Sequence, residues 1–346
     1  MGLITKTLTW SAVGVGAIAA IRALRHQHRR IDFRGKTVVI TGGARGLGLV
    51  MARQFAHQGA KVAMCARDEA ELIRAKADVQ LYAVDPNAVL TFVCDVTDRE
   101  QVGRFIDAVE QRLGPVDVLV NNAGTILVTP FEHVTEADMR ELMEANFWSV
   151  VHTVDAVLPR MRARRQGRIV NVASLAGKIA LPHLLPYAVS KFAVVGYSEG
   201  IRSELVKDGI YVTTVCPGLI RTGSPRNAYV KGQPEKEYAW FKISDSLPLV
   251  SVSAETCARA ILAACKAGQA ELIVSVPAKL VSLVHGLFPE LTADGLASVN
   301  RLLPDPAPAE VGAQRVKGKS TETGITQSTL TTATDEAALA NNQFAR

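Results

Sequence analysis

The stretch Thr41-Gly-Gly-Ala-Arg-Gly-Leu-Gly48 carries the strongest structural signal in the chain, because of what stands on either side of it. The β-branched run 36–40 directly before it predicts a strand, and the stretch 49–58 after it predicts a helix. Glycines let the turn between them bend sharply and come close to a pyrophosphate. The helix N-terminus then offers free N–H groups and a positive dipole end to the phosphates. Strand, glycine turn and helix in this order predict a dinucleotide-binding loop, with a plain glycine-rich turn as the alternative.

Strands and helices alternate along most of the remaining chain. The length of 346 residues and a hydrophobic content of 48% allow one large α/β domain with tails. Alternation of this kind predicts a doubly wound, Rossmann-type parallel sheet of about seven strands. The expected strands are 37–41, 61–65, 90–94, 116–120, 168–172, 211–216 and 271–276, and the longest expected helices are 136–163, 186–207 and 254–267.

A second pattern is the pair formed by Tyr187 and Lys191. A spacing of four residues is about one helical turn, so both side chains project from one helix face. A free tyrosine phenol ionises near pH ~10 and is a poor proton donor or acceptor at neutrality. An ammonium group held beside it favours the phenolate and lowers the phenol pKa toward a working range. The spacing is common on protein surfaces, so its weight depends on the other motifs.

Six motifs in the same order resemble the short-chain dehydrogenase/reductase family, over about residues 33–277. The glycine turn is similar to the family's T-G-x-x-x-G-x-G, through Gly42, Gly46 and Gly48. The remaining matches are Asp95-Val96 after a strand, Asn122-Ala123-Gly124 within an N-N-A-G, Asn146 on a helix, Ser174 thirteen residues before Tyr187, and Pro217-Gly218 with Thr222 in P-G-x-x-x-T.

The resemblance implies a role for each of four catalytic residues. Tyr187 would act as general acid in reduction and as general base in oxidation, and Lys191 would lower its pKa and hold the nicotinamide ribose. Ser174 would hydrogen-bond the substrate oxygen as it gains charge. Asn146 would steady a water linked to Lys191. The residues expected to contact the cofactor are Gly42, Arg45, Gly46, Leu47, Gly48, Arg67, Asp95, Val96, Asn122, Ala123, Gly124, Tyr187, Lys191, Pro217, Gly218 and Thr222.

The end of the second expected strand bears on the choice of cofactor. NAD-binding proteins usually place Asp or Glu there, to accept a hydrogen bond from the ribose 2′-hydroxyl. This chain has Ala66 followed by Arg67, and Arg45 lies in the glycine turn. A guanidinium pairs well with a 2′-phosphate, so we expect NADP(H) to be preferred. Asp68, one position later, means that NAD(H) is not excluded as the cofactor. The alternative interpretation is that Arg45 and Arg67 are solvated surface residues that do not bind a phosphate.

The amino-terminal segment begins with an uncharged apolar run, Leu8 to Ile21, which is followed by Arg22, Arg25, Arg29 and Arg30. A bilayer-spanning helix needs about 20 apolar residues. We expect residues 1–32 to form a membrane anchor and basic flank, with the arginines and the catalytic domain on the cytoplasmic side. An amphipathic surface helix is a second interpretation. A signal peptide cleaved after Ala19 is a third, which four arginines after the run disfavour.

The two carboxy-terminal parts differ in composition. Residues 278–304 are markedly apolar and are expected to form a helical extension of the catalytic domain, residues 33–277. Residues 305–346 are rich in Pro, Ala, Thr, Ser and Gly and predict a disordered tail, because they bury little apolar area.

Composition excludes some partners. The net charge of +6 owes much to the amino-terminal arginines, and basic and aromatic residues do not interleave as in nucleic-acid-binding surfaces. The seven histidines show no metal-ligand spacing, so no metal site is expected. The five cysteines form no C-x-x-C pair and are expected to be buried thiols of a reducing compartment. Expected partners are membrane lipid, through the amino-terminal segment, and further copies of the chain in a homodimer or homotetramer.

These features together predict an NADP-dependent carbonyl reductase or alcohol dehydrogenase. The apolar segments, and aromatic residues within 223–249, favour a lipophilic substrate. A catalytically silent NADP-binding membrane redox sensor or scaffold is the alternative, and the complete set of Asn146, Ser174, Tyr187 and Lys191 argues against it.

Overall fold

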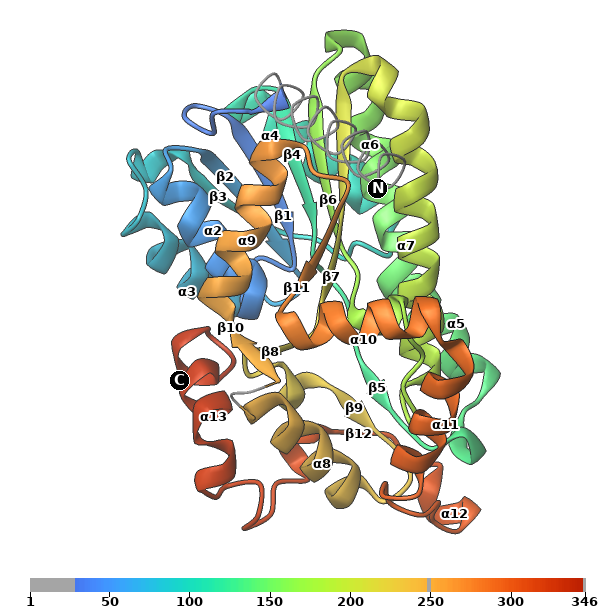
Figure 1. The fold of residues 1–346 in the computed structure, drawn as a ribbon. Coiled ribbons are helices and arrows are strands. Elements are labelled where there is room, and N and C mark those ends of the chain that lie inside the picture. Colours follow the sequence, from blue (N-terminus) through green and yellow to red (C-terminus); the bar gives the residue numbers. More distant parts are fainter. Residues whose placement is uncertain (1–28, 248–249, 345–346) are drawn as a thin grey trace, which may run out of the picture.

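A seven-stranded parallel sheet forms the centre of the molecule in the computed structural model, which describes residues 29–247 and 250–344 (Figure 1). The order across the sheet is β3-β2-β1-β4-β6-β7-β11, which confirms the predicted doubly wound arrangement. The strands are β1 (Thr37–Thr41), β2 (Lys61–Ala66), β3 (Val89–Val93), β4 (Val116–Asn121), β6 (Gly167–Val172), β7 (Ile210–Pro217) and β11 (Glu271–Val274).

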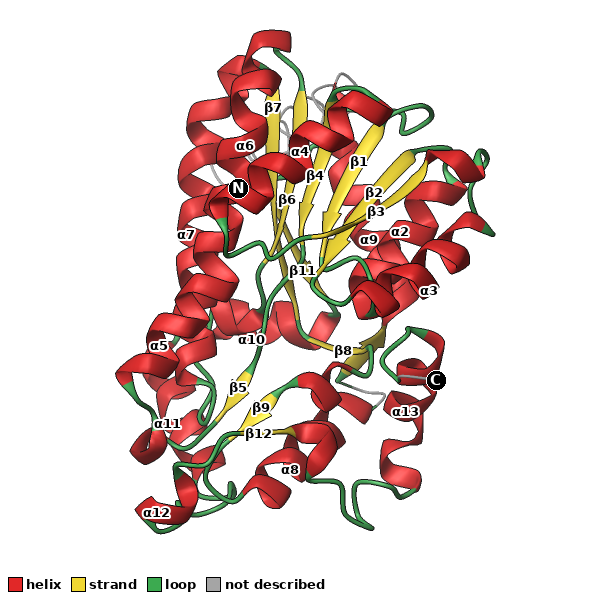
Figure 2. Ribbon diagram, turned by 180° about the vertical axis from the view of Figure 1, so that it is seen from behind, coloured by secondary structure: helices red, strands yellow, loops and turns green. Residues whose placement is uncertain are grey.

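Helices cover both faces of this sheet (Figures 1 and 2). Successive residues of a strand face opposite sides, so Val38 and Ile40 enter one core and Val39 enters the other. Strands buried on both faces appear in sequence as continuous apolar runs, which is why they could be predicted. One face packs against α2 (Gly46–His57), α3 (Glu69–Gln80) and α9 (Ala254–Ala267). The other packs against α4 (Arg99–Leu113), α6 (Ser149–Arg164) and α7 (Leu185–Leu205).

The helix expected over 136–163 is interrupted. It consists of α5 (Glu136–Met143), a π-helical turn (Glu144–Trp148) and α6. The wider turn displaces the side chains that follow it and contains Asn146, which is fully buried. Such turns are frequent at functional sites, and the apolar periodicity of a helix gives no sign of them.

A smaller lobe lies at the carboxyl ends of the strands (Figure 2). It contains a three-stranded sheet of β5 (Leu127–Val128), β9 (Tyr229–Val230) and β12 (Val316–Lys317). A two-stranded sheet of β8 (Leu219–Arg221) and β10 (Ser251–Ser253) and helix α8 (Pro234–Ser246) complete it. Its own apolar core contains Val128, Leu184, Ala228, Val230, Tyr238 and Phe241. This lobe places a second, smaller apolar core next to the end of the sheet where the expected site residues lie.

The expectation of a disordered tail over 305–346 is wrong for the residues that the structure describes. They contain α12 (Ala309–Gly312), β12 and α13 (Thr332–Ala340), and β12 pairs antiparallel with β9. The tail folds because its polar groups form hydrogen bonds and ion pairs with buried groups of the domain. The ammonium of Lys242, fully buried, lies 2.7 Å from a carboxylate oxygen of Asp335 and 2.6 Å from the Thr326 carbonyl. A prediction that counts apolar residues misses such a network.

The helical pair between the sheet and the tail is α10 (Val276–Leu287) and α11 (Pro289–Asn300). No residue of α11 is buried, and in α10 only Ala278 is. Its exposed large apolar side chains are Val276, Leu280, Val281, Leu283, Leu287, Phe288, Leu291 and Val299.

The expected amino-terminal anchor falls on residues 1–28, which lie outside the described residues. From residue 29 the chain joins the domain: the N–H of Ile31 donates to the Lys266 carbonyl at 3.0 Å, and the Arg168 guanidinium donates to the Arg29 carbonyl. Among the helices of residues 29–247 and 250–344, none combines the length and apolar character needed to cross a membrane.

Candidate active site

The glycine turn between β1 and α2 has no space for side chains. Gly42 and Gly46 have φ of +63° and +56°, in the left-handed region that favours glycine. A Cβ on Gly48 would lie 2.2 Å from the carbonyl oxygen of Gly42. Leu47 follows Gly46 in the first turn of α2, where backbone N–H groups lack partners within the helix. This arrangement fits a phosphate group on physical grounds, because glycines and the first N–H groups of α2 lie together in one turn.

The N-N-A-G segment holds this turn from the neighbouring strand. The Asn122 side-chain amide donates to the carbonyls of Thr41 and Gly42, each at 3.2 Å. In return, the Thr41 hydroxyl accepts from the N–H groups of Asn122 and Ala123, each at 3.0 Å. Asn122 therefore fixes the shape of the glycine turn.

Gly124 permits the close approach of two expected catalytic residues. A Cβ at this position would lie 2.8 Å from Asn146 Oδ1 and 3.6 Å from Lys191 Nζ. The structure thus brings the end of β4, the π-helical turn and α7 together at one point.

Tyr187 and Lys191 lie one turn apart on α7, with the Lys191 ammonium 5.7 Å from the centre of the Tyr187 ring. Lys191 Nζ donates to the Val172 carbonyl at 3.0 Å. Burial lowers the pKa of Lys191 to about 8, with Cys216 acting in the opposite direction. Burial also raises the pKa of Tyr187, and a hydrogen bond with Ser174 opposes that rise. The expected lowering of the Tyr187 pKa by Lys191 is not seen in this arrangement: burial raises that pKa, and Lys191 is not among the groups that shift it.

Ser174 follows β6 and caps a short 3₁₀ helix (Leu175–Gly177). Its hydroxyl accepts from the N–H of Ala176 at 3.1 Å and hydrogen-bonds the Tyr187 phenol. Ser174 and Tyr187, separated by a long loop in sequence, therefore point to the same place.

Asn146 is held by its own contacts. Its Oδ1 accepts from the N–H of Thr125 at 2.8 Å, and its amide nitrogen donates to the Thr125 carbonyl at 3.0 Å and to the Ser190 hydroxyl at 2.9 Å. The Ser190 hydroxyl in turn donates to the Tyr187 carbonyl at 2.7 Å. Ser190 thereby connects Asn146 to α7, a role that its place between Tyr187 and Lys191 did not reveal.

The two expected phosphate-binding arginines differ in their surroundings. Arg45 Nη1 donates to Glu71 Oε1 at 2.8 Å. The Arg67 side chain, just beyond β2, is 76% exposed and its guanidinium is 3.9 Å from Asp95. Asp95 also accepts from the N–H of Thr97 at 3.0 Å. Arg67 is therefore the less restrained of the two cations.

The remaining expected cofactor residues follow β3 and β7. The Val96 carbonyl lies 3.4 Å from a ring nitrogen of His152. Pro217 ends β7, and Gly218 packs so closely on α10 that a Cβ there would lie 3.3 Å from Ala278. The hydroxyl of buried Thr222 accepts from the N–H of Ser224 at 3.1 Å.

Sequence reasoning missed a buried polar cluster beside the Ser174–Tyr187 loop. His183 adopts a φ of +59°, and its Nδ1 lies 2.9 Å from a carboxylate oxygen of Glu237, a fully buried residue of α8. The Trp240 indole donates to the same carboxylate at 2.7 Å. The cluster joins that loop to α8. Glu237 and Trp240 lie more than fifty positions further along the chain, so no local pattern indicated the contact.

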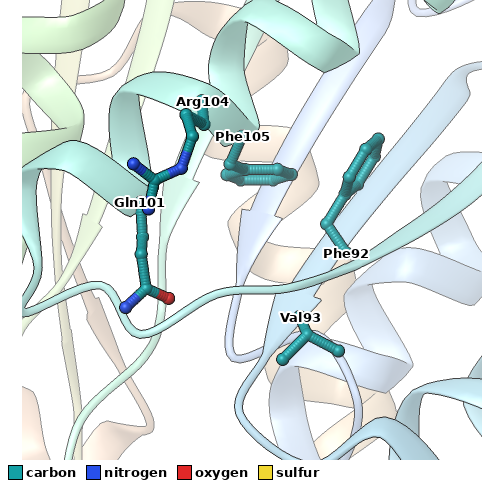
Figure 3. A pocket seen from close by; sticks show the side chains of 5 residues that line it. All are labelled: Phe92, Val93, Gln101, Arg104 and Phe105. Carbon is teal, nitrogen blue, oxygen red and sulfur yellow. The ribbon is translucent and has the colours of Figure 1, made fainter.

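A hollow of about 230 Å³ lies between β3 and α4, lined by Phe92, Val93, Gln101, Arg104 and Phe105 (Figure 3). None of the expected site residues lines it.

Comparison with known proteins defines the class. A family model described as short chain dehydrogenase matches residues 36–231, more than half of the chain. The chain therefore belongs to the short-chain dehydrogenase family, whose members are oxidoreductases that bind a nicotinamide cofactor.

Individual relatives are similar to different extents. The chain is 40% identical over 189 residues to 3-dehydrosphinganine reductase of Danio rerio, a match that spans 54% of this chain and 57% of that enzyme. A short-chain dehydrogenase from Streptomyces avermitilis superposes with a TM-score of 0.66 at 27% identity, over 77% of this chain and 97% of that one. A variant actinorhodin polyketide ketoreductase, solved with NADPH, gives a TM-score of 0.61 at 30% identity, over 69% and 95% of the two chains.

Proposed function

We propose that the protein is an NADP(H)-dependent oxidoreductase that interconverts a ketone and an alcohol, with Tyr187 as the proton donor in reduction. The observation that carries this proposal is the meeting of Ser174, Tyr187, Lys191 and Asn146 beside the glycine turn. The names of the ketoreductase and 3-dehydrosphinganine reductase relatives support carbonyl reduction as the reaction class.

Each of the four residues would have a separate role in the reduction of a ketone. When bound, the cofactor supplies a hydride to the carbonyl carbon. The Ser174 hydroxyl hydrogen-bonds the carbonyl oxygen and holds it near the phenol of Tyr187. Tyr187 donates its proton to that oxygen as negative charge develops there. The positive charge of Lys191 favours the resulting phenolate, and Asn146 keeps α7 in position through Ser190.

The donors available to the cofactor fit NADP(H) better than NAD(H). The glycines of the turn let the backbone come close to a pyrophosphate, and no carboxylate stands at Ala66 to accept from a ribose 2′-hydroxyl. Asp68 is engaged as the N-cap of α3, where it accepts from the N–H of Glu71 at 2.8 Å. Arg67, which is mostly exposed, is free to pair with a 2′-phosphate.

Replacing Arg67 by alanine is expected to weaken NADPH binding by roughly 10-fold and to leave NADH binding nearly unchanged, because the lost contact is to the 2′-phosphate. Titrating both cofactors into the wild type and the variant measures the difference. Arg104→Ala is the matched control, since Arg104 is similarly exposed and lies on α4. Equal weakening of NADPH and NADH binding, or a wild type that prefers NADH, would contradict the assignment of Arg67 to the 2′-phosphate.

A lipophilic substrate fits the surroundings of the site. The core of the smaller lobe, with Leu184 and Phe241, places apolar side chains close to the Ser174–Tyr187 loop. The relative from Danio rerio is named for a sphingoid ketone. We include in the proposal a membrane anchor in residues 8–21, with the catalytic domain on the cytoplasmic side. The exposed apolar residues of α10 and α11 agree with attachment to a lipid surface.

Deleting residues 2–28 is expected to release the protein from membranes and to retain cofactor binding, because the contacts of Arg29 and Ile31 with the domain remain. The full-length chain should sediment with membranes and resist extraction by high salt. Release by salt would instead indicate a surface helix held by its arginines. A mature chain that begins at Ala20 would overturn the anchor in favour of export.

A further inference from the structure

The described end of the chain lies on the glycine turn. The Gly46 N–H donates to the Asn341 carbonyl at 2.9 Å, and the Asn342 side-chain amide donates to the Ala44 carbonyl at 2.8 Å. The side-chain nitrogen of Gln343 lies 2.8 Å from where a Cβ of Gly46 would stand. In Figure 1 this carboxy-terminal segment, in red, lies directly below α3. It therefore covers the place where the first turn of α2 presents its donors.

The same segment also contacts the opposite side of the site. The Asn227 side-chain amide, five positions after Thr222, donates to Gln343 Oε1 at 2.5 Å. Gly223 has a φ of +80°, and a Cβ there would overlap Ala338. Residues 338–343 thus bridge the glycine turn and the loop after β8, the two sides between which the proposed cofactor phosphates would lie.

The base of this segment is fixed in the fold. Lys242 of α8 is fully buried and is satisfied by Asp335 and by the Thr326 carbonyl. The hydroxyls of Ser246 and Thr334, both buried, lie 2.6 Å apart. Removing this part of the tail would leave a buried charge without a partner, which is strongly destabilising. Residues 322–338 therefore stay in place while the protein is folded.

The tip, residues 341–343, is attached differently. Its contacts are hydrogen bonds: the buried Asn341 accepts from Arg53 through Oδ1 at 3.2 Å, and Asn342 accepts from Arg74 through Oδ1 at 2.8 Å. Asn342 adopts a φ of +56°, which asparagine tolerates better than most residues. A short polar tip on a fixed base can lift without unfolding the remainder of the tail.

The chemistry of the tip suits a phosphate neighbour. Asn341, Asn342 and Gln343 all carry amide donors, and residues 337–346 contain no Asp or Glu. The Asn341 carbonyl accepts from the Gly46 N–H, so it must move away before a phosphate oxygen can accept from that group. Side-chain amide donors without neighbouring carboxylates can then add to phosphate binding.

We propose that residues 338–344 are a strap that closes over the phosphate end of the cofactor site and adds the side-chain amide of Gln343 to the groups that hold the bound dinucleotide. The strap rests on the proposed function, because it presumes that the site binds NADP(H). The tip opens for exchange of the cofactor and closes on the bound form.

A chain ending at Ala340 tests the strap directly. We expect its NADPH dissociation rate constant, measured by stopped-flow displacement, to rise at least roughly 10-fold and its Kd to rise with it. A chain ending at Phe344 is the matched control. Within the full chain, Gln343→Glu is expected to weaken NADPH more than Gln343→Ala, because the added carboxylate repels phosphate. Thermal unfolding should change little in each variant, since the Lys242 network is intact.

Hydrogen exchange of residues 338–344 gives a readout independent of activity. NADPH should slow exchange there, as expected for a strap that closes on the cofactor. Faster exchange with NADPH, or tighter NADPH binding by the shortened chain, would show that the tip excludes the cofactor and would overturn the strap. An unchanged NADPH dissociation rate constant in the shortened chain would mean that residues 338–344 only pack on the surface, and would also overturn the strap. If neither the full nor the shortened chain binds a nicotinamide dinucleotide, the proposed function fails as well; if only the shortened chain binds one, the strap alone fails.

Discussion

Tyr187→Phe is expected to lower turnover by at least roughly 10²-fold, the usual scale of general acid–base catalysis, and to leave NADPH affinity nearly unchanged. Phenylalanine fills the same space and removes only the hydroxyl, which hydrogen-bonds Ser174. The proton donor is lost, whereas the glycine turn and Lys191 remain. Steady-state rates with a ketone substrate, together with a fluorescence titration of NADPH, measure the two quantities separately.

Tyr197→Phe is the matched control for this variant. Tyr197 lies on the same helix and packs edge-on against Phe147, and burial raises its pKa to about 12. We expect this control to keep wild-type turnover. Near-normal turnover in Tyr187→Phe would exclude Tyr187 as the proton donor.

Gly48→Ala is expected to abolish measurable cofactor binding and to destabilise the fold by about 1–3 kcal/mol, the cost of inserting a methyl group into a closely packed site. The new Cβ would lie 2.2 Å from the Gly42 carbonyl oxygen and 2.7 Å from the Asn122 amide nitrogen. The turn must open, and the donors of α2 move away from the phosphates. Thermal unfolding and NADPH titration of the purified variant measure both effects.

Gly103→Ala on α4 is the control for this substitution. A Cβ at Gly103 meets nothing within 4 Å, so the change should stabilise the helix by about 0.5–1 kcal/mol. Unchanged NADPH affinity in Gly48→Ala would mean that the glycine turn does not hold the cofactor.

Local patterns were sufficient to predict the sheet and much of the candidate site. Val38, Val39 and Ile40 form a continuous apolar run because their strand is buried on both faces, and such a run is visible in sequence. Tyr187 and Lys191 share a helix, so their proximity follows from spacing alone. The meeting of Ser174 with Tyr187 followed from resemblance to a family, since no local rule connects residues across that loop.

What could not be predicted depends on contacts between distant segments. Lys242 and Asp335 are 93 positions apart, and each alone resembles an ordinary surface residue. Their pairing orders a tail whose composition predicts disorder. His183 and Glu237 are 54 positions apart, so their contact could not be predicted from a local pattern either. The direction of the Tyr187 pKa shift was also missed, because it depends on how deeply the phenol is buried.

The central claim is that a hydride passes from NADPH to a carbonyl carbon while Tyr187 donates a proton to the carbonyl oxygen. The most direct test uses NADPH deuterated at C4, a panel of lipophilic ketones and mass spectrometry of the alcohols formed. We predict deuterium on the carbinol carbon of at least one product with wild-type protein, and formation of that product at least roughly 10²-fold more slowly with Tyr187→Phe. Binding of NADPH without deuterium transfer to any ketone would contradict the claim and would favour a cofactor-binding protein without catalysis.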